Sequence, residues 1–240
     1  MQVIPGQSGL AAPFILYSIT ASSWGKKAFA KRLMGCAFPV CESGILVTCR
    51  HCTENISEEE LLVVQHPTET TCHRVESISS HPTLDVSFIT ISAKTPLWPS
   101  PILPELLLTV PVFAYGFYDH TIEEGNIFAI PQVYSGTITA TPRRNDSKLG
   151  TLLPFYQVSF PTFPGFSGSP LYAEIPGGIA LAGMLFGNRS SKVVERQLDE
   201  YDDGKTRIVE KSVRIWECGV AHTCETLRIA SSELKKSIWV

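Results

Sequence analysis

The chain has 240 residues, of which 44% are apolar and 18% are charged. This balance is typical of a globular protein with a sizeable core and excludes a disordered chain. The formal net charge is −3, whereas dedicated nucleic-acid binders carry a strong basic excess, so we expect no nucleic-acid partner. No uninterrupted apolar stretch approaches the roughly 18 residues of a transmembrane helix, so we also expect no membrane partner.

The N-terminal region is interpreted as a strand rather than a secretory signal. Residues 10–20 are fairly apolar, but no Lys or Arg precedes them, and a signal peptide begins with a positively charged segment. The chain has seven cysteines, an odd number. An odd count without a signal is typical of reduced thiols in the cytosol. We therefore expect a cytoplasmic protein, with secretion as the minority interpretation.

Two cysteines, Cys49 and Cys52, have the C-x2-C spacing found in zinc sites, and Cys72–His73 follows them. A structural zinc site usually has two such ligand pairs, and only one clean pair is present. We therefore interpret the cysteines as small buried apolar side chains and expect neither a metal nor a cofactor.

Short apolar runs bounded by turn residues recur along the chain and predict an all-β protein. The Pro-rich stretch Thr95–Pro104 divides the chain, so we predict one domain over residues 1–103 and a second over residues 104–240. The last ten residues, Ser231–Val240, resemble a Ser-capped helix. The predicted strands are Phe14–Ile19, Ile45–Thr48, Leu61–Val64, Val86–Ile91, Val110–Tyr115, Gln132–Ala140, Phe155–Phe160 and Ile179–Phe186.

The segment Val193–Lys211 is rich in Asp and Glu. We predict a solvated hairpin that turns at Asp203–Gly204, because Asp-Gly is a strong hairpin signal. A calcium loop is the alternative, but the segment lacks an EF-hand-like spacing of oxygen ligands.

Three segments carry a His, an Asp and a Ser, in that order. His51 follows the apolar run Ile45–Thr48, Asp85 precedes the run Val86–Ile91, and Ser167 lies in a G-x-S-G motif. A serine hydroxyl becomes a nucleophile when a base takes its proton and an acid orients that base. Glycines on both sides let the backbone turn sharply, so the N–H groups of Gly165 and Ser167 are candidates for an oxyanion hole.

Competing residues fit this chemistry less well. A second G-x-S-G motif contains Ser8, but no strand precedes it, so we interpret Ser8 as a flexible-tail residue. Asp119 and Asp146 lie in polar contexts with no strand directly behind them. Neither serine lies in the G-x-S-x-G motif of the α/β-hydrolases.

With these segments the sequence resembles the trypsin-like serine peptidases of the chymotrypsin fold, and most closely their HtrA/Deg-like branch. The resemblance covers roughly residues 13–235. It implies two antiparallel six-stranded β-barrels with a short C-terminal helix and no PDZ domain. His51 and Asp85 would come from the first barrel and Ser167 from the second. The matching blocks are Gly35–Phe38, Gly44–Thr48, Val75–Ile91, Val112–Gly116, Ser135–Thr141, Pro164–Tyr172, Ile179–Gly183 and Gly219–Ala221.

Some positions depart from the family pattern. Phe166 stands where trypsin-like zymogens have an Asp that pairs with a newly cut N-terminus, so that activation route is not expected. The strand Leu181–Phe186 lacks the His with which glutamyl endopeptidases bind glutamate, and also the Ser that commonly supports the triad Asp. Cys36 and Cys52 occupy positions that hold a disulfide in secreted relatives; we expect thiols here.

The resemblance places the floor of the substrate pocket at Pro161 and a wall at Met184, Leu185 and Phe186. Because residues 155–166 include no charged side chain, we predict cleavage after small or medium apolar residues such as Val, Leu, Ala or Phe. The predicted function is that of a serine endopeptidase acting on peptide or protein substrates through an acyl-enzyme. The alternative is a catalytically silent module that serves as a protein-binding scaffold. A viral or host-defence processing protease fits the same residues, and the oligomeric state stays open.

Overall fold

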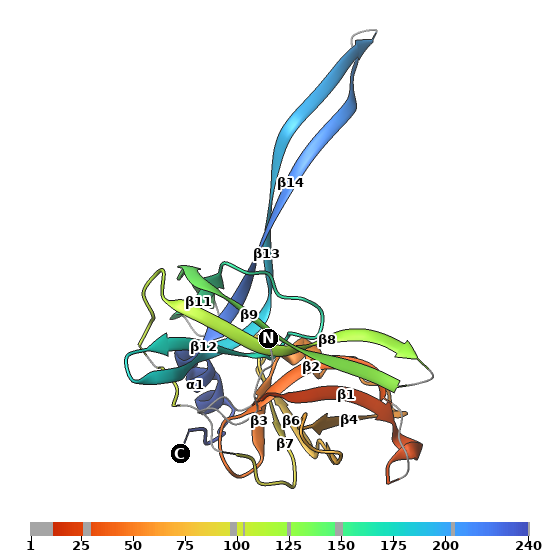
Figure 1. Cartoon of the computed structure of the whole chain (residues 1–240), viewed down its shortest axis with the longest axis vertical. Coiled ribbons are helices and arrows are strands. Elements are labelled where there is room, and N and C mark those ends of the chain that lie inside the picture. The colour runs from red at the N-terminus through yellow and green to blue at the C-terminus, as the bar shows by residue number, and fades with distance from the viewer. Residues whose placement is uncertain are drawn as a thin grey trace.

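A computed structural model of the chain describes residues 12–25, 30–96, 100–102, 104–123, 126–146, 151–202 and 205–239. These residues form two antiparallel β-sheets and one α-helix near the C-terminus (Figure 1). The expected all-β architecture with a short C-terminal helix is therefore confirmed. Among the described residues, no helix is both long enough and apolar enough to cross a membrane.

The first sheet has the strand order β5-β4-β1-β2-β3-β7-β6. Strands β5 and β6 are separated only by Val75 and Glu76, whose N–H groups donate to Leu62 O in β4 (3.0 Å) and Thr90 O in β7 (2.8 Å). Strands β5 and β6 thus act as one bent strand that joins the two edges of the sheet. Counted in this way, the sheet closes into a barrel of six strands. The strands are β1 (Phe14–Thr20), β2 (Ala30–Pro39), β3 (Ile45–Thr48), β4 (Glu60–Gln65), β5 (Cys72–Arg74), β6 (Ser77–Ser80) and β7 (Ser87–Thr90).

The second sheet has the order β10-β11-β14-β13-β12-β8-β9, and an additional pairing of β11 with β9 closes its ring. Strand β10 stays outside, so this barrel also has six strands. The chain passes from the first sheet to the second between Thr90 and Pro111, the stretch that includes the predicted domain boundary. The strands are β8 (Pro111–Glu123), β9 (Asn126–Ala140), β10 (Arg143–Asp146), β11 (Thr151–Val158), β12 (Pro170–Ile175), β13 (Gly178–Asp202) and β14 (Lys205–Thr223).

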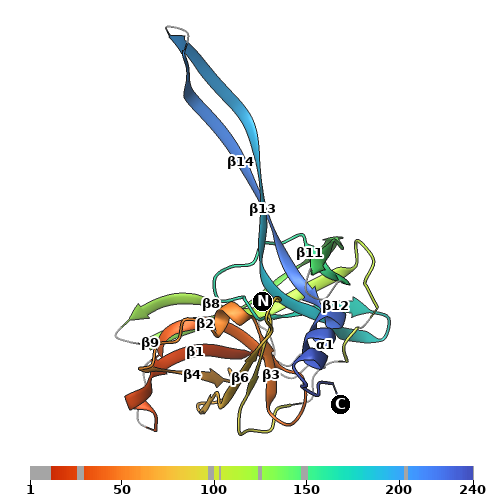
Figure 2. The same ribbon diagram turned by 180° about the vertical axis from the view of Figure 1, so that it is seen from behind.

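Strands β13 and β14 continue far beyond the barrel as a hairpin arm that projects from the body of the molecule (Figures 1 and 2). Their pairing runs from Gly183↔Thr223 to Asp202↔Lys205. The predicted hairpin is confirmed, and it is longer than the sequence pattern indicated. Its expected turn residues, Asp203 and Gly204, lie outside the described residues.

The hydrophobic core continues across the two barrels. One buried cluster contains Phe38 and Val47 of the first barrel, Tyr172 and Leu181 of the second, and Leu227 of the helix. Each strand contributes alternate side chains to such a core, because successive residues point to opposite faces. The shared core fixes the barrels against each other, and with them the residues at their junction.

The helix α1 spans Cys224–Glu233, earlier in the chain than the predicted Ser231–Val240. Thr223 is its N-cap and accepts a hydrogen bond from the N–H of Thr226 (3.1 Å). Ser231, the predicted cap, is instead buried inside the helix. The prediction of its start was wrong because burial of Leu227 and Ala230 against the barrels positions the helix, which the terminal residues alone do not reveal.

Candidate active site

The first barrel brings His51 and Asp85 together. His51 lies in a short 3-10 turn, Arg50–Cys52, directly after β3, and Asp85 lies in the loop before β7. Strands β3 and β7 are paired neighbours, with Thr48 opposite Ser87. Asp85 Oδ2 lies 2.7 Å from His51 Nδ1, and Asp85 Oδ1 accepts the backbone N–H of His51 at 3.0 Å. Both carboxylate oxygens therefore hold the same residue.

This pairing changes the pKa of both groups. The hydrogen bond to the Asp85 carboxylate raises the pKa of His51 above its usual value, because it stabilises the imidazolium. Burial would raise the pKa of Asp85, but the hydrogen bonds from the His51 ring and backbone outweigh burial and lower it. An ionised Asp85 keeps the proton of a neutral His51 on Nδ1 and leaves the Nε2 lone pair available to act as a base.

The second barrel supplies Ser167 from the loop between β11 and β12. The carbonyl oxygen of Ser167 accepts the backbone N–H of Cys36 in β2 (2.8 Å), and the Sγ of Cys52 lies 3.8 Å from the same oxygen. Cys52 directly follows His51, so the serine loop is held against the turn that carries the base. Among the described residues, no hydrogen bond joins Ser167 Oγ to the His51 ring. Such catalytic hydrogen bonds commonly tighten only when substrate is bound.

The glycines of the G-x-S-G motif are required by their backbone and by close packing. Gly165 and Gly168 have φ values of +94° and +85°, in the left-handed region that favours glycine. A Cβ on Gly168 would lie 2.0 Å from the carbonyl oxygen of Cys36, and one on Gly165 would lie 2.3 Å from that of Phe117. The motif therefore allows the serine loop to approach both β2 and β8.

The same loop presents free backbone donors. The N–H of Phe166 donates to Phe163 O (3.0 Å), and that of Gly168 donates to Leu185 O (2.9 Å). By contrast, no backbone carbonyl in the described part of the chain accepts the N–H of Gly165 or of Ser167. These two donors flank Phe166 and are available to a developing oxyanion.

Of the predicted pocket residues, Met184 and Leu185 are buried, and Phe186 and Pro161 are half-buried. Met184 packs in the core cluster that spans the barrels, and Leu185 packs in the cluster of the second barrel. Phe186 stacks on His222 with a ring-centroid distance of 4.1 Å. Pro161 is half-buried at the start of the loop that leads to Ser167. Phe186 packs against the same cluster as Met184, because alternate residues of a strand point to one face, whereas Leu185 points to the other face.

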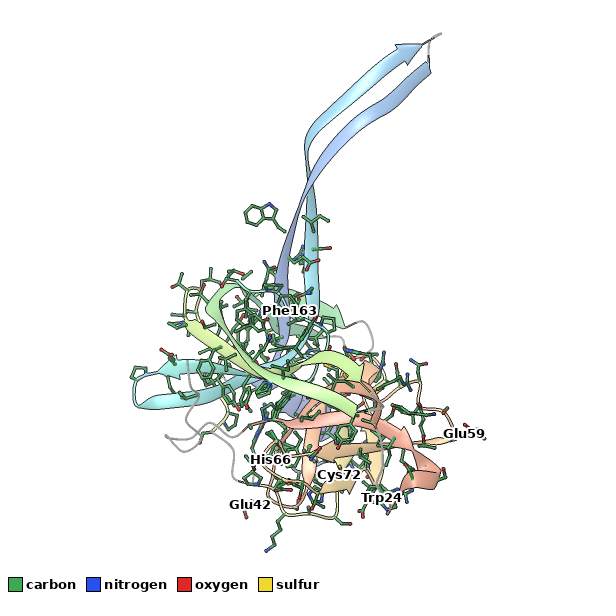
Figure 3. All side chains as sticks on the ribbon, turned by 45° about the vertical axis from the view of Figure 1, so that its right-hand side comes forward. Trp24, Glu42, Glu59, His66, Cys72 and Phe163 are labelled. Atoms are coloured by element: carbon green, nitrogen blue, oxygen red, sulfur yellow. The ribbon has the colours of Figure 1, made fainter. Side chains whose placement is uncertain are left out.

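A polar pair missed by the sequence analysis crosses this region. Asn188 Oδ1 accepts hydrogen bonds from the N–H (2.6 Å) and the hydroxyl (2.7 Å) of Thr162, and Asn188 Nδ2 donates to Thr162 O (2.7 Å). Thr162 directly follows Pro161. In the next turn of the loop Phe163 is exposed, and it stacks on Tyr134 at 5.1 Å (Figure 3). The sequence signal that could have pointed to Asn188 was its position two residues after Phe186, the last residue of the predicted pocket wall.

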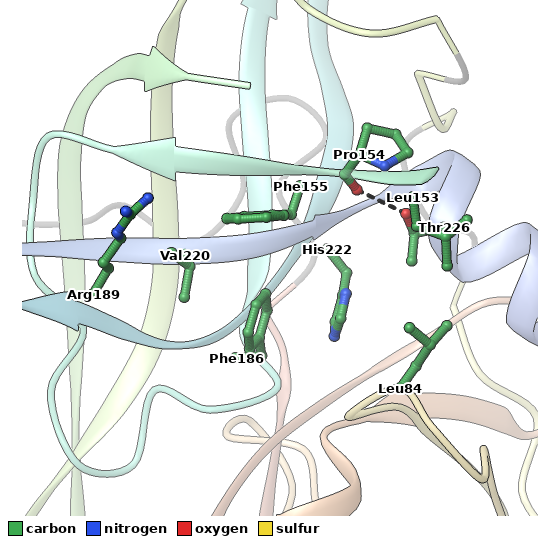
Figure 4. A pocket seen from close by; sticks show the side chains of 9 residues that line it. All are labelled: Leu84, Leu153, Pro154, Phe155, Phe186, Arg189, Val220, His222 and Thr226. Atoms are coloured by element: carbon green, nitrogen blue, oxygen red, sulfur yellow. Dashed lines mark hydrogen bonds between the residues drawn. The ribbon is translucent and has the colours of Figure 1, made fainter. Parts of the chain in front are cut away.

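A cavity of about 220 Å³ is lined in part by Leu84, the residue before Asp85 (Figure 4). His222 of β14 faces it and is buried, and its positive form is a further influence that lowers the pKa of Asp85. His222 directly follows the family block Gly219–Ala221 and was missed by the sequence analysis. The cavity is lined by Leu84, Leu153, Pro154, Phe155, Phe186, Arg189, Val220, His222 and Thr226.

All seven cysteines are free thiols, including Cys36 and Cys52. The Sγ of Cys36 donates to the carbonyl of Gly165 (3.2 Å) and so helps to hold the serine loop. The competing Ser8 lies outside the described residues, as do the side chains of Asp119 and Asp146.

Comparisons with known proteins identify the family and the fold. The family model of the trypsin-like peptidase domain matches residues 35–175. No curated protein sequence matches the chain. The active form of the Rv3671c protease from M. tuberculosis has a TM-score of 0.58 at 14% identity, over 96% of this chain and 84% of that one. The HtrA-type protease AlgW, solved with a decapeptide, has a TM-score of 0.60 at 18% identity, over 95% of this chain and 65% of that one.

At these identities the solved structures establish a common fold, that of the HtrA-type proteases. The family model goes further, because it spans more than half of the chain, including His51, Asp85 and Ser167. The protein therefore belongs to the trypsin-like peptidase family and is a serine endopeptidase.

Proposed function

We propose that Ser167 is the nucleophile, that His51 is its general base and then acid, and that Asp85 orients His51. The observation that carries this proposal is the double contact of Asp85 with His51, at Nδ1 (2.7 Å) and at the backbone N–H (3.0 Å). A carboxylate in this position fixes the imidazole tautomer and stabilises the imidazolium that forms during the reaction.

The reaction would proceed in two halves. His51 Nε2 takes the proton of Ser167 Oγ as that oxygen attacks the substrate carbonyl carbon, and the oxyanion accepts hydrogen bonds from the N–H groups of Gly165 and Ser167. The C–N bond then breaks as His51 gives its proton to the leaving amine. A water molecule attacks the acyl-enzyme in the same way, with His51 again acting first as base and then as acid. No step needs a Lewis acid.

We also propose that the enzyme cleaves after small or medium apolar residues. Residues 155–166 carry no charge that could pair with an ionic substrate side chain, and burying such a side chain unpaired costs several kcal/mol. The bonded pair Thr162–Asn188 spans the region predicted for the pocket and favours the smaller members of this group. A cytoplasmic location is proposed as well, supported by the unbonded thiols of Cys36 and Cys52.

The alternative expected from sequence is a catalytically silent binding module, and the lack of a Ser167–His51 hydrogen bond among the described residues is the one observation on its side. Labelling with a fluorophosphonate distinguishes the two, because the reagent bonds only to an activated serine. We expect labelling of the wild type and of Ser8→Ala, the matched control from the second G-x-S-G motif, but not of Ser167→Ala. An unlabelled wild type that still binds peptides would establish the binding module instead.

A further inference from the structure

Two thiols and an imidazole lie close together beside the loop that carries Ser167. The Sγ atoms of Cys49 and Cys52 and a ring nitrogen of His51 all lie within 4.8 Å of one another. All three residues belong to the turn that follows β3, at spacings of two and one residues. Cys49 and Cys52 are fully buried, whereas the His51 side chain is 48% exposed. The cluster therefore combines two buried thiols with an imidazole that solvent can reach.

The second half of the pattern noted in the sequence does not take part. Cys72 lies on β5, where it pairs with Gln65, and its Sγ is 2.7 Å from the hydroxyl of Tyr17 (Figure 3). His73 on the same strand contacts Glu69. The third potential ligand beside Cys49 and Cys52 is thus His51, which lies in the same turn.

We propose that Cys49, Cys52 and His51 form a binding site for Zn²⁺, and that occupation of this site inhibits the enzyme reversibly. Two thiolates and one imidazole are a known ligand set for zinc with an open fourth position, which a water molecule would fill. Ligand atoms of a tetrahedral zinc site lie roughly 3.5–3.8 Å apart, so the cluster needs only a small contraction. On binding, both thiols lose their protons to solvent, because a coordinated thiol is deprotonated. The Sγ–H bond of Cys49 to Leu185 O (3.3 Å) is given up in that step.

The inhibitory effect rests on the proposed function of His51, whereas the binding site does not. If Nε2 binds the ion, the lone pair that must accept the Ser167 proton is occupied. If Nδ1 binds it, the contact with Asp85 is broken. Either mode removes the base, and withdrawal of the metal restores it. The position of Cys52 next to the carbonyl of Ser167 (3.8 Å) brings the ion close to the nucleophile's loop as well.

The binding test uses the reduced, metal-free full chain and Co²⁺ as a spectroscopic probe. We expect one equivalent of Co²⁺ to give sulfur-to-metal charge-transfer absorption, which Zn²⁺ abolishes by displacement. Cys49→Ser and Cys52→Ser should each weaken binding by about 10-fold or more. His51→Ala should do so too, and its exposed side chain makes it the variant least prone to misfold. Cys72→Ser is the matched control and should bind as the wild type does.

The activity test measures peptide hydrolysis as Zn²⁺ is added and then removed with EDTA. We expect half-inhibition at the concentration at which Zn²⁺ displaces Co²⁺, and full recovery in EDTA. Co²⁺ binding of equal strength in the wild type and in His51→Ala would overturn the site, as would loss of binding in Cys72→Ser. An active enzyme indifferent to Zn²⁺ would also overturn it. Cobalt–sulfur absorption in a protein that no fluorophosphonate labels would support the site while contradicting the proposed catalytic role of Ser167.

Discussion

His81 Nε2 lies 2.9 Å from Glu233 Oε2 and so ties the loop that carries Asp85 to the end of helix α1. His81 is buried, and its Nδ1 accepts the backbone N–H groups of Leu84 (3.1 Å) and Thr83 (3.3 Å). Because Nδ1 accepts, Nε2 carries the proton and donates it to the carboxylate. The imidazole thus holds the loop from inside and links it to Glu233, which lies 152 positions after His81 in the chain.

Replacement of His81 by Ala should therefore loosen this loop. Two backbone N–H groups would lose their acceptor, so we expect a loss of about 1–3 kcal/mol in the free energy of unfolding, together with a lower kcat. Denaturant unfolding and steady-state kinetics measure the two effects. Glu233→Gln keeps an acceptor for Nε2 and is the matched control, for which the losses should be clearly smaller. Equal losses in both variants would show that the backbone contacts to His81 contribute little.

The pairing of Asp85 with His51 predicts a specific pH dependence. Only neutral His51 acts as a base, so the rate should rise with pH through the pKa of His51. Because Asp85 raises that pKa above its usual value of about 6.5, the rise should lie above that pH in the wild type. Asp85→Asn should move the rise to lower pH and reduce the rate at its plateau by about 10⁴-fold.

The measurement for this prediction is the pH profile of kcat/KM. Asp146→Asn, which removes one of the competing acids of the sequence, is the control and should leave the profile unchanged. A profile of Asp85→Asn that rises at the same pH as that of the wild type would contradict the assigned pairing.

Gly168, the glycine after Ser167, should tolerate no side chain. Gly168 has φ +85°, and a Cβ there would lie 2.0 Å from Cys36 O. The left-handed backbone alone costs a non-glycine residue about 1–2 kcal/mol, and the overlap with a carbonyl in β2 adds to it. We expect Gly168→Ala to lower the free energy of unfolding by more than about 2 kcal/mol, measured by denaturant unfolding. Gly187→Ala, where a Cβ meets no atom within 4 Å, is the matched control and should have almost no effect.

The positions of His51 and Asp85 could be predicted from sequence, because each lies next to a short apolar run that is typical of a strand. The apolar runs before His51 and after Asp85 are strands, and the paired register Thr48↔Ser87 brings their ends together. The partners of these residues depend on contacts between distant segments, which no local pattern specifies. Thr162 meets Asn188 across 26 residues, and His81 meets Glu233 across 152.

The same distinction between local pattern and long-range packing applies to the predicted pocket wall and to the helix. The family resemblance placed Met184, Leu185 and Phe186 in one pocket wall, and in the structure the alternation along β13 packs Met184 and Phe186 against one cluster and Leu185 against another. The start of helix α1 was placed at Ser231 because that residue is a good cap in isolation. Thr223 caps the helix instead, since the segment Cys224–Ala230 packs against the core cluster.

The last prediction concerns the residue before the cleaved bond. If Thr162 and Asn188 narrow the pocket, peptides with Ala or Val at this position should be cleaved faster than matched peptides with Phe, and those with Arg, Lys or Glu should be the poorest substrates.

Asn188→Gly removes the side chain that makes three hydrogen bonds with Thr162, so it should raise kcat/KM for the Phe peptide relative to the Val peptide. One or two methylene-sized differences in an apolar pocket change kcat/KM by roughly 10–200-fold, which sets the scale of the expected shift. Ser159→Ala, in the same loop but outside the bonded pair, is the control and should leave the ratio unchanged. A wild type that prefers Arg, Lys or Glu would show that a charge from another segment reaches the pocket, and an Asn188→Gly variant with an unaltered Phe-to-Val ratio would show that the pair does not limit the size of the side chain bound.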